Sequence, residues 1–368
     1  MLAAGVLSLV GLAAAQPPST VDAATELLEQ LDARAFADRE AAERSLRGAT
    51  DAAADAILDY RAKSAESAAR LRRLRPVLRR RKFEALAAAA TEGDGGAARQ
   101  VPGIDRFATR LSPAAFNRLA AAVATRLARS TGDLTTPQQR FEAALRAEVV
   151  DGDYGVDLAA LAALASHPEV KLSVEDVIVL NSGWDSASLR RAARDEATGP
   201  LVRLTLGSML ANFPPELQAM ALMDCAALDV DGLEDVCVSI LNAGGEPDSI
   251  ATALAVLSRS RSTSVLSLFE DRMSDRTVIY RTYKDEFGSV RVSDVALAGA
   301  LLIIGEDPRK LGFDRLRIDD RTGFRPGTAA PRDDDARRAA GEHYRDVVAR
   351  RVPDVQPPPV RAVVGERL

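Results

Sequence analysis

Few residues of this 368-residue chain have the type and spacing that catalysis requires. A Ser-His-Asp or Cys-His nucleophile uses a histidine as its base. The two histidines are His167, which precedes a proline in an apparent turn, and His343, which lies in a highly charged stretch. We interpret both as solvated or helix-capping side chains. Glycine-rich phosphate loops and Gly-x-Ser-x-Gly elbows do not occur in the sequence, so we predict no catalytic residue, no cofactor and no enzyme activity.

The carboxylates between Asp229 and Asp235 are the nearest approach to a calcium site. Oxygen ligands suit Ca²⁺, but an EF-hand loop needs ligands at fixed positions, a central glycine and a terminal glutamate. The segment DVDGLED does not follow that frame. Acidic residues at the start of the next helix also interact favourably with its dipole. We therefore predict no metal site.

The two cysteines, Cys225 and Cys237, lie six residues on either side of Asp231 in a predicted turn. In an antiparallel helical hairpin such positions face each other at similar height. A disulfide needs Cα atoms about 4.4–6.8 Å apart, and an oxidising compartment would favour it. They form a candidate disulfide, and the alternative is two buried thiols that act as small apolar side chains.

Charge is uneven along the first part of the chain. Residues 21–66 contain eleven acidic and six basic residues, whereas residues 67–83 contain eight basic and no acidic residues. The basic run is a candidate partner-binding face or an ordinary solvated surface. It comprises Arg70, Arg72, Arg73, Arg75, Arg79, Arg80, Arg81 and Lys82. Nucleic acid is disfavoured because aromatic residues are not interleaved with the arginines and the net charge is −5.

The elements that would position these residues are helices. From Val21 onward apolar residues recur at three- and four-residue steps, which is typical of amphipathic helices. Ser112, Thr136 and Ser173 are predicted N-caps. Pro76 predicts that one helix ends near Arg75 and that another begins with the proline. The alternating stretch 277–283 stands alone, and we interpret it as an extended loop, because an isolated strand cannot satisfy its hydrogen bonds.

Internal similarity suggests that the helices repeat. A shift of 32 residues places Ala221-Leu222 on Ala253-Leu254, and a further shift of 43 places these on Ala296-Leu297. Apolar positions kept in register are what stacked helical hairpins need, because each hairpin buries its face against the next. The predicted fold is all-α, with stacked antiparallel hairpins in an irregular HEAT-like α-solenoid.

Composition divides the chain into five predicted segments. The apolar residues before Ala15 predict a cleaved export signal, since the run is too short to span a membrane. The mature protein would then be periplasmic or secreted, without a membrane span. The segments are a signal peptide (1–15), an N-terminal helical unit (20–90), a Gly-rich linker (91–103), a helical-repeat domain (104–312) and a polar, Pro-rich tail (313–368) with a helix over 335–350.

Both ends of the chain resemble exported bacterial HEAT-like repeat proteins. The stretch FADREAAERSL from Phe36 to Leu46 is similar to their opening unit. The stretch VRVSDVALAGALLIIG from Val290 to Gly305, followed by EDPRKLGF, is similar to their closing unit. Gly327 and residues 333–340 resemble the polar tail after it. The resemblance implies an α-solenoid scaffold and brings no catalytic residues.

The leading hypothesis is therefore an exported, non-catalytic scaffold that binds a protein or an acidic polymer along its surface. One alternative is a nucleic-acid-binding HEAT-type module that uses the basic helices at 70–82. Another is a helical hydrolase whose carboxylates lie scattered along a groove. Such an enzyme would need two acids with perturbed pKa values that face one pocket.

Overall fold

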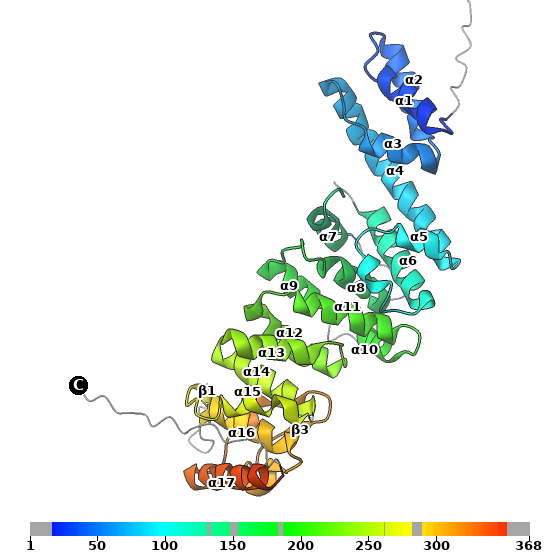
Figure 1. Ribbon diagram of the computed structural model, residues 1–368. Coiled ribbons are helices and arrows are strands. Elements are labelled where there is room, and N and C mark those ends of the chain that lie inside the picture. Colours follow the sequence, from blue (N-terminus) through cyan, green and yellow to red (C-terminus); the bar gives the residue numbers. More distant parts are fainter. Residues whose placement is uncertain are drawn as a thin grey trace, which may run out of the picture. The chain divides into compact units, whose positions relative to one another are not determined.

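The computed structural model is mostly helical (Figure 1). It describes residues 17–130, 134–147, 154–182, 187–260, 262–281 and 289–351. Within these ranges the chain forms seventeen α-helices and two short two-stranded sheets. It divides into two compact units, Met1–Leu164 and Ala165–Leu368, which we describe separately. The predicted signal peptide lies outside the described residues.

The first unit begins with four helices, α1 to α4, that share one core. Helices α5 to α8 follow, and α5 and α6 pack against α4. The predicted N-caps of α6 and α7 are confirmed. Ser112 Oγ accepts a hydrogen bond from the Ala115 amide, and Thr136 Oγ1 accepts one from the Gln139 amide. The elements are α1 (Val21–Gln30), α2 (Phe36–Arg47), α3 (Asp51–Asp59), α4 (Ala65–Thr91), α5 (Gly95–Arg99), η1 (Asp105–Phe107), α6 (Pro113–Arg129), α7 (Pro137–Leu145) and α8 (Tyr154–Ala165).

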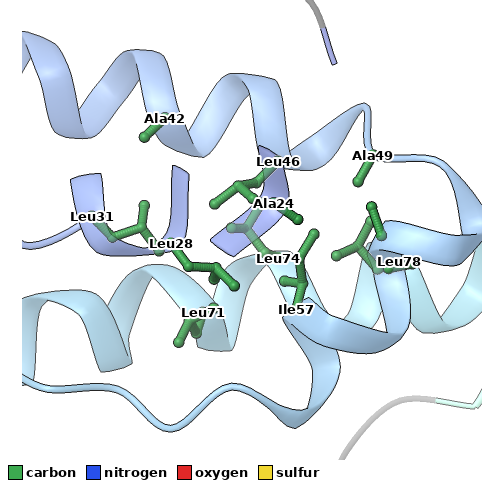
Figure 2. Close-up of a cluster of buried hydrophobic side chains, with 12 residues drawn as sticks. Ala24, Leu28, Leu31, Ala42, Leu46, Ala49, Ile57, Leu71, Leu74 and Leu78 are labelled. Atoms are coloured by element: carbon green, nitrogen blue, oxygen red, sulfur yellow. The ribbon is translucent and has the colours of Figure 1, made fainter. Parts of the chain in front are cut away.

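Apolar side chains from α1, α2, α3 and α4 point toward one another in a single cluster (Figure 2). Leu28, Leu46, Ile57 and Leu74 are at most 1% exposed. Burying one such side chain stabilises the fold by about 1.5–3 kcal/mol. These contacts therefore fix which face of α4 is covered by the other three helices.

The predicted break at Pro76 is wrong, because α4 continues from Ala65 to Thr91 with the proline inside it. A proline in a helix removes one backbone hydrogen bond and disfavours helical geometry before it. Here Leu71 and Leu74 before the proline and Leu78 after it are buried in the same core. This shared packing outweighs the local cost, and the Pro76 ring lies on the exposed side of α4.

The predicted linker at 91–103 carries the short helix α5, capped by Asp94. Ala98 and Val101 are fully buried, and α5 packs against both α4 and α6. The boundary between the two compact units falls after Leu164 instead.

The second unit contains the remaining helices and both sheets. The predicted cap at Ser173 is confirmed, because its Oγ accepts a hydrogen bond from the Asp176 amide at 3.1 Å. The helices are α9 (Val174–Asn181), α10 (Ala187–Arg194), α11 (Gly199–Ala211), α12 (Pro215–Ala227), α13 (Leu233–Ala243), α14 (Pro247–Leu257), α15 (Leu266–Glu270), α16 (Val292–Ile303) and α17 (Asp334–Arg351), with 3-10 turns at Ser258–Ser260, Thr263–Val265, Pro308–Leu311 and Pro326–Thr328.

Alternate helices of this unit lie against one another. Helix α12 packs against α14, and α14 packs against α16, while α13 packs against both α12 and α14. The residues that the sequence shifts superpose are all in the core, since Leu222, Leu254 and Leu297 are at most 6% exposed. The shifts thus align buried positions of neighbouring helices.

The loop predicted for the alternating stretch at 277–283 is wrong for its described part. Strand β1 (Val278–Arg281) pairs antiparallel with β2 (Ser289–Arg291), with Tyr280 opposite Val290. The partner strand comes directly before α16, at the start of the stretch that resembles a helical closing unit. Strands β3 (Ile318–Asp319) and β4 (Gly323–Phe324) form a second antiparallel pair.

The helix expected at 335–350 is present as α17, which packs against α16. The Asp294 carboxylate, with no exposed side-chain surface, accepts hydrogen bonds from Arg337 Nε at 2.6 Å and from Arg337 Nη2 at 3.2 Å. Tyr344, which is 3% exposed, donates a hydrogen bond to Glu270 at 2.9 Å. Helix α17 is therefore anchored to α16 through Arg337 and to α15 through Tyr344.

Candidate functional site

The eight residues of the predicted basic face do not share one environment. All lie on α4, which packs against α2, α3, α5 and α6 and therefore has covered and uncovered sides. Some of the cations point into this packing and satisfy acceptors there. Others lie on the side that the rest of the unit leaves exposed.

Arg70 is the most buried of the eight, with 2% of its side chain exposed. Its Nη1 donates hydrogen bonds to Glu40 Oε1 and Glu43 Oε2, each at 2.7 Å. Its Nε donates to Glu66 Oε1 at 2.8 Å. The Arg70 hydrogen bond lowers the pKa of Glu40, and the same bond is the main cause that raises the pKa of Arg70. Arg70 therefore joins α2 to α4 and is not available to a partner.

Three further cations also bind groups within the unit. Arg75 donates to the Tyr60 carbonyl, Arg81 donates to the Ala49 carbonyl, and Lys82 pairs with Asp55. Arg79 is half-buried. These contacts tie α4 to α3 and to the segments on either side of α3.

The exposed side of α4 carries the remaining cations. Arg73 and Arg80 have 60% and 69% of their side chains exposed, and Arg72 is also exposed. Pro76 and Val77, which is 44% exposed, lie between these arginines in the sequence. We define the outer face of α4 as Arg72, Arg73, Pro76, Val77 and Arg80.

Two acidic side chains already contact this face. Arg73 Nη2 lies 3.2 Å from Glu43 Oε2, and Arg80 Nε lies 2.8 Å from Glu84 Oε1. Arg80 and Glu84 are both exposed, and such a pair contributes about 0–1 kcal/mol, so Glu84 can be exchanged for a carboxylate of another molecule. Glu43 is only 8% exposed and also binds Arg70, so it stays in place while Arg73, 60% exposed, can bind a further carboxylate.

The candidate disulfide between Cys225 and Cys237 is not formed, and both are free thiols, which is the alternative that the sequence left open. Cys225 on α12 and Cys237 on α13 have no exposed surface. Burial raises the pKa of the Cys225 thiol well above its usual value and raises that of Cys237 to about 12. Spacing about the turn sets the height of the two residues along their helices, whereas packing sets where the side chains point.

The other candidates from the sequence have structural roles. The His167 Nδ1 accepts a hydrogen bond from the Glu169 amide at 3.2 Å, and His343 Nε2 lies 3.4 Å from Glu306 Oε2. Asp229 pairs with Arg259 at 2.5 Å. Across the described ranges, no three His, Cys, Asp or Glu side chains are grouped in a way that would hold a metal ion.

Two surface features of the second unit were missed from the sequence. Val174, Ile178 and Val179 expose 53–55% of their surface on α9, which also carries buried Val177 and Leu180. Four consecutive apolar residues, Val177 to Leu180, cannot all lie on one buried face of a helix, and this was the available signal. The second feature is a recess of about 410 Å³, whose lining combines both charge signs and includes Arg259, Glu306, Asp307, Arg309 and Asp319. Its lining residues come from segments that are distant in the sequence, so the recess could not be predicted from the sequence.

Comparison with protein-family models, with curated proteins and with solved structures finds no match to this chain. Among the described residues, no helix combines the length and the apolar character that a membrane crossing requires. A functional conclusion therefore depends on the geometry of the chain itself.

Proposed function

We propose that this protein is a non-catalytic scaffold of stacked HEAT-like helical hairpins that binds an acidic partner, a protein or a polymer, through its surface. The observation that carries the proposal is the division of the basic residues of α4. Arg70, Arg75, Arg81 and Lys82 satisfy acceptors within the unit. The outer face of α4 keeps its guanidinium groups in water. Guanidinium groups bind carboxylate, sulfate and phosphate oxygens in paired hydrogen bonds.

The packing of the second unit supports the scaffold part of the proposal. Helices α12, α14 and α16 follow one another, with α13 and α15 beside them. Repeat proteins of this kind bind partners over extended surfaces through many shallow contacts. The exposed apolar side chains of α9 offer a further contact area on the same scaffold.

Binding of fluorescein-labelled poly-glutamate to the full chain, followed by anisotropy, tests the proposal. Because exposed ion pairs are weak individually, the triple variant Arg72→Gln, Arg73→Gln, Arg80→Gln is expected to bind about tenfold more weakly. The matched control replaces Arg99, Arg118 and Arg129, which are also exposed in the same unit, and is expected to bind like the parent chain. Affinity should also fall as salt screens the charges.

Two results would contradict this function. Equal loss of affinity in the triple variant and its control would show that only net charge matters. Tighter, arginine-dependent binding of a short DNA duplex than of poly-glutamate would favour the nucleic-acid-binding module instead. Its salt dependence would then report the number of phosphates contacted.

We also propose that the scaffold acts outside the cytoplasm, on the basis of the apolar sequence before Ala15. Fractionation of cells that express the chain with a C-terminal tag tests this. Export should release a protein shorter than the full chain by about the signal segment. Recovery of the full-length protein from the cytoplasm would contradict it.

A further inference from the structure

We propose that the outer face of α4 binds an acidic amphipathic helix of a partner protein, with an apolar side chain of that helix placed on Pro76 and Val77. This inference rests on the proposed function and narrows the partner from any acidic molecule to one kind of protein segment. It depends on the spacing of the arginines and on the apolar surface between them.

The spacing of the arginines matches a helix. Arg73 and Arg80 are seven residues apart on α4, which is about 10.5 Å along the axis at 1.5 Å per residue. Two turns separate them, so their side chains leave the same side of α4. Acidic residues seven positions apart on a partner helix have the same separation. An extended chain rises about 3.3 Å per residue and alternates its side chains, so it matches less well.

An apolar surface separates the two ends of the basic face. Val77 is 44% exposed and follows the exposed ring of Pro76. Arg72 and Arg73 lie about one turn before these residues, and Arg80 lies about one turn after them. A polymer that consists only of anionic groups has nothing to cover this surface. An amphipathic helix with a leucine between its carboxylates would remove it from water.

The opposite side of α4 holds the face in place. Leu71, Leu74 and Leu78 are fully buried behind it, and Arg70 is bonded to three glutamates. A binding surface that is already ordered loses little conformational freedom when its partner arrives. At Arg80 the partner must replace Glu84, whereas at Arg73 it binds beside Glu43, which remains buried against Arg70. Only a partner whose carboxylates have the spacing of Arg73 and Arg80 can bind both arginines, so the face selects for that spacing.

Three labelled probes, two helical peptides and poly-glutamate, test the inference by their binding to the full chain. The first carries pairs of glutamates one heptad apart with a leucine midway, and the second has alanine in place of that leucine. The third probe is labelled poly-glutamate. Val77→Ser should weaken binding of the leucine peptide about fivefold, from the lost apolar contact, and should leave the other two probes unchanged. The matched control is Val21→Ser, because Val21 is 49% exposed on α1 of the same unit.

The outcomes separate this inference from the proposed function. If Val77→Ser leaves the leucine peptide unaffected while the triple arginine variant weakens all three probes, an acidic partner remains and the apolar-centred helix is refuted. If the triple variant weakens none of them, the proposed function and this inference both fail. Circular dichroism of each variant confirms that the helices are retained.

Discussion

Replacement of Arg70 by methionine should destabilise the first four helices, although the residue belongs to a run that reads as a surface patch. Methionine keeps much of the side-chain volume and removes the charge. The consequence falls mainly on Glu43, whose side chain is only 8% exposed. Glu40 and Glu66 are 40% and 53% exposed, so water replaces the lost hydrogen bonds there.

The size of the effect follows from this difference in exposure. Removing one member of a buried ion pair costs about 3–5 kcal/mol, because the other charge is left without compensation. Arg73 and Arg47 lie 3.2 and 3.5 Å from Glu43 and are 60% and 56% exposed, so they compensate in part. We therefore expect a loss of about 3 kcal/mol, the lower end of that range. The exposed control Arg72→Met should stay within about 0.5 kcal/mol of the parent chain.

Native-state hydrogen exchange of the full chain, read by mass spectrometry, measures the local effect. A loss of about 3 kcal/mol corresponds to exchange roughly 150-fold faster in peptides from α2 and α4. The double variant Arg70→Met, Glu43→Met should recover part of the protection, because it also removes the buried Glu43 carboxylate that has lost its Arg70 partner. Equal protection in Arg70→Met and Arg72→Met would refute the structural role assigned to Arg70.

Three more predictions concern pH, thiol reactivity and the C-terminal helix. Arg70 lowers the pKa of Glu40, so this contact stabilises the fold above the unfolded pKa of about 4.3 and is lost as pH falls through the folded value. The protection factors of α2 amides, which correct exchange for its intrinsic pH dependence, should therefore fall only in acid and stay constant between pH 6 and 8. Burial raises the pKa of Cys237 to about 12, so at pH 8 the native thiol should react with Ellman's reagent about a thousandfold more slowly than in urea, and rapid native reaction would contradict its burial. Asp294→Ala removes the buried partner of Arg337 and should loosen α17 by about 1–3 kcal/mol, seen as faster proteolysis within that helix, whereas unchanged proteolysis would show that apolar packing alone holds it.

The helical character of this protein could be predicted because its signals are local. Ser112, Thr136 and Ser173 each cap the helix that follows, and cap chemistry needs only neighbouring residues. The prediction failed at Pro76, because it considered only that proline disfavours a continuous helix and not the tertiary packing of the neighbouring residues. Buried leucines before and after the proline keep α4 continuous.

Strand pairing lay beyond the sequence for a different reason. Strand β1 finds its partner β2 only after an intervening segment, and nothing near Tyr280 identifies that partner. Val290, the apolar residue of β2, also begins the stretch that resembles a helical closing unit. Val290 is buried as a strand residue, so composition alone could not distinguish the two.

The candidate site could be predicted in part. The basic run is evident in the sequence, but the prediction treated it as one face and did not separate a buried side from an exposed one, although the signal was present. Arg70 lies four residues before Leu74 and eight before Leu78, on the apolar stripe of the helix. A charge on such a stripe requires a buried partner, and the acidic excess in residues 21–66 supplied one.

Helix α17 covers apolar surface of α16 that would otherwise be open to contact with other molecules. Ala336, Ala340, Tyr344 and Val347 form the apolar stripe of α17 and are buried, while α16 behind them is apolar on nearly every side. Stacks of helices with an open last layer tend to add further layers, including those of neighbouring molecules. With α17 laid over α16, this apolar surface of α16 is withdrawn from contact with neighbouring molecules.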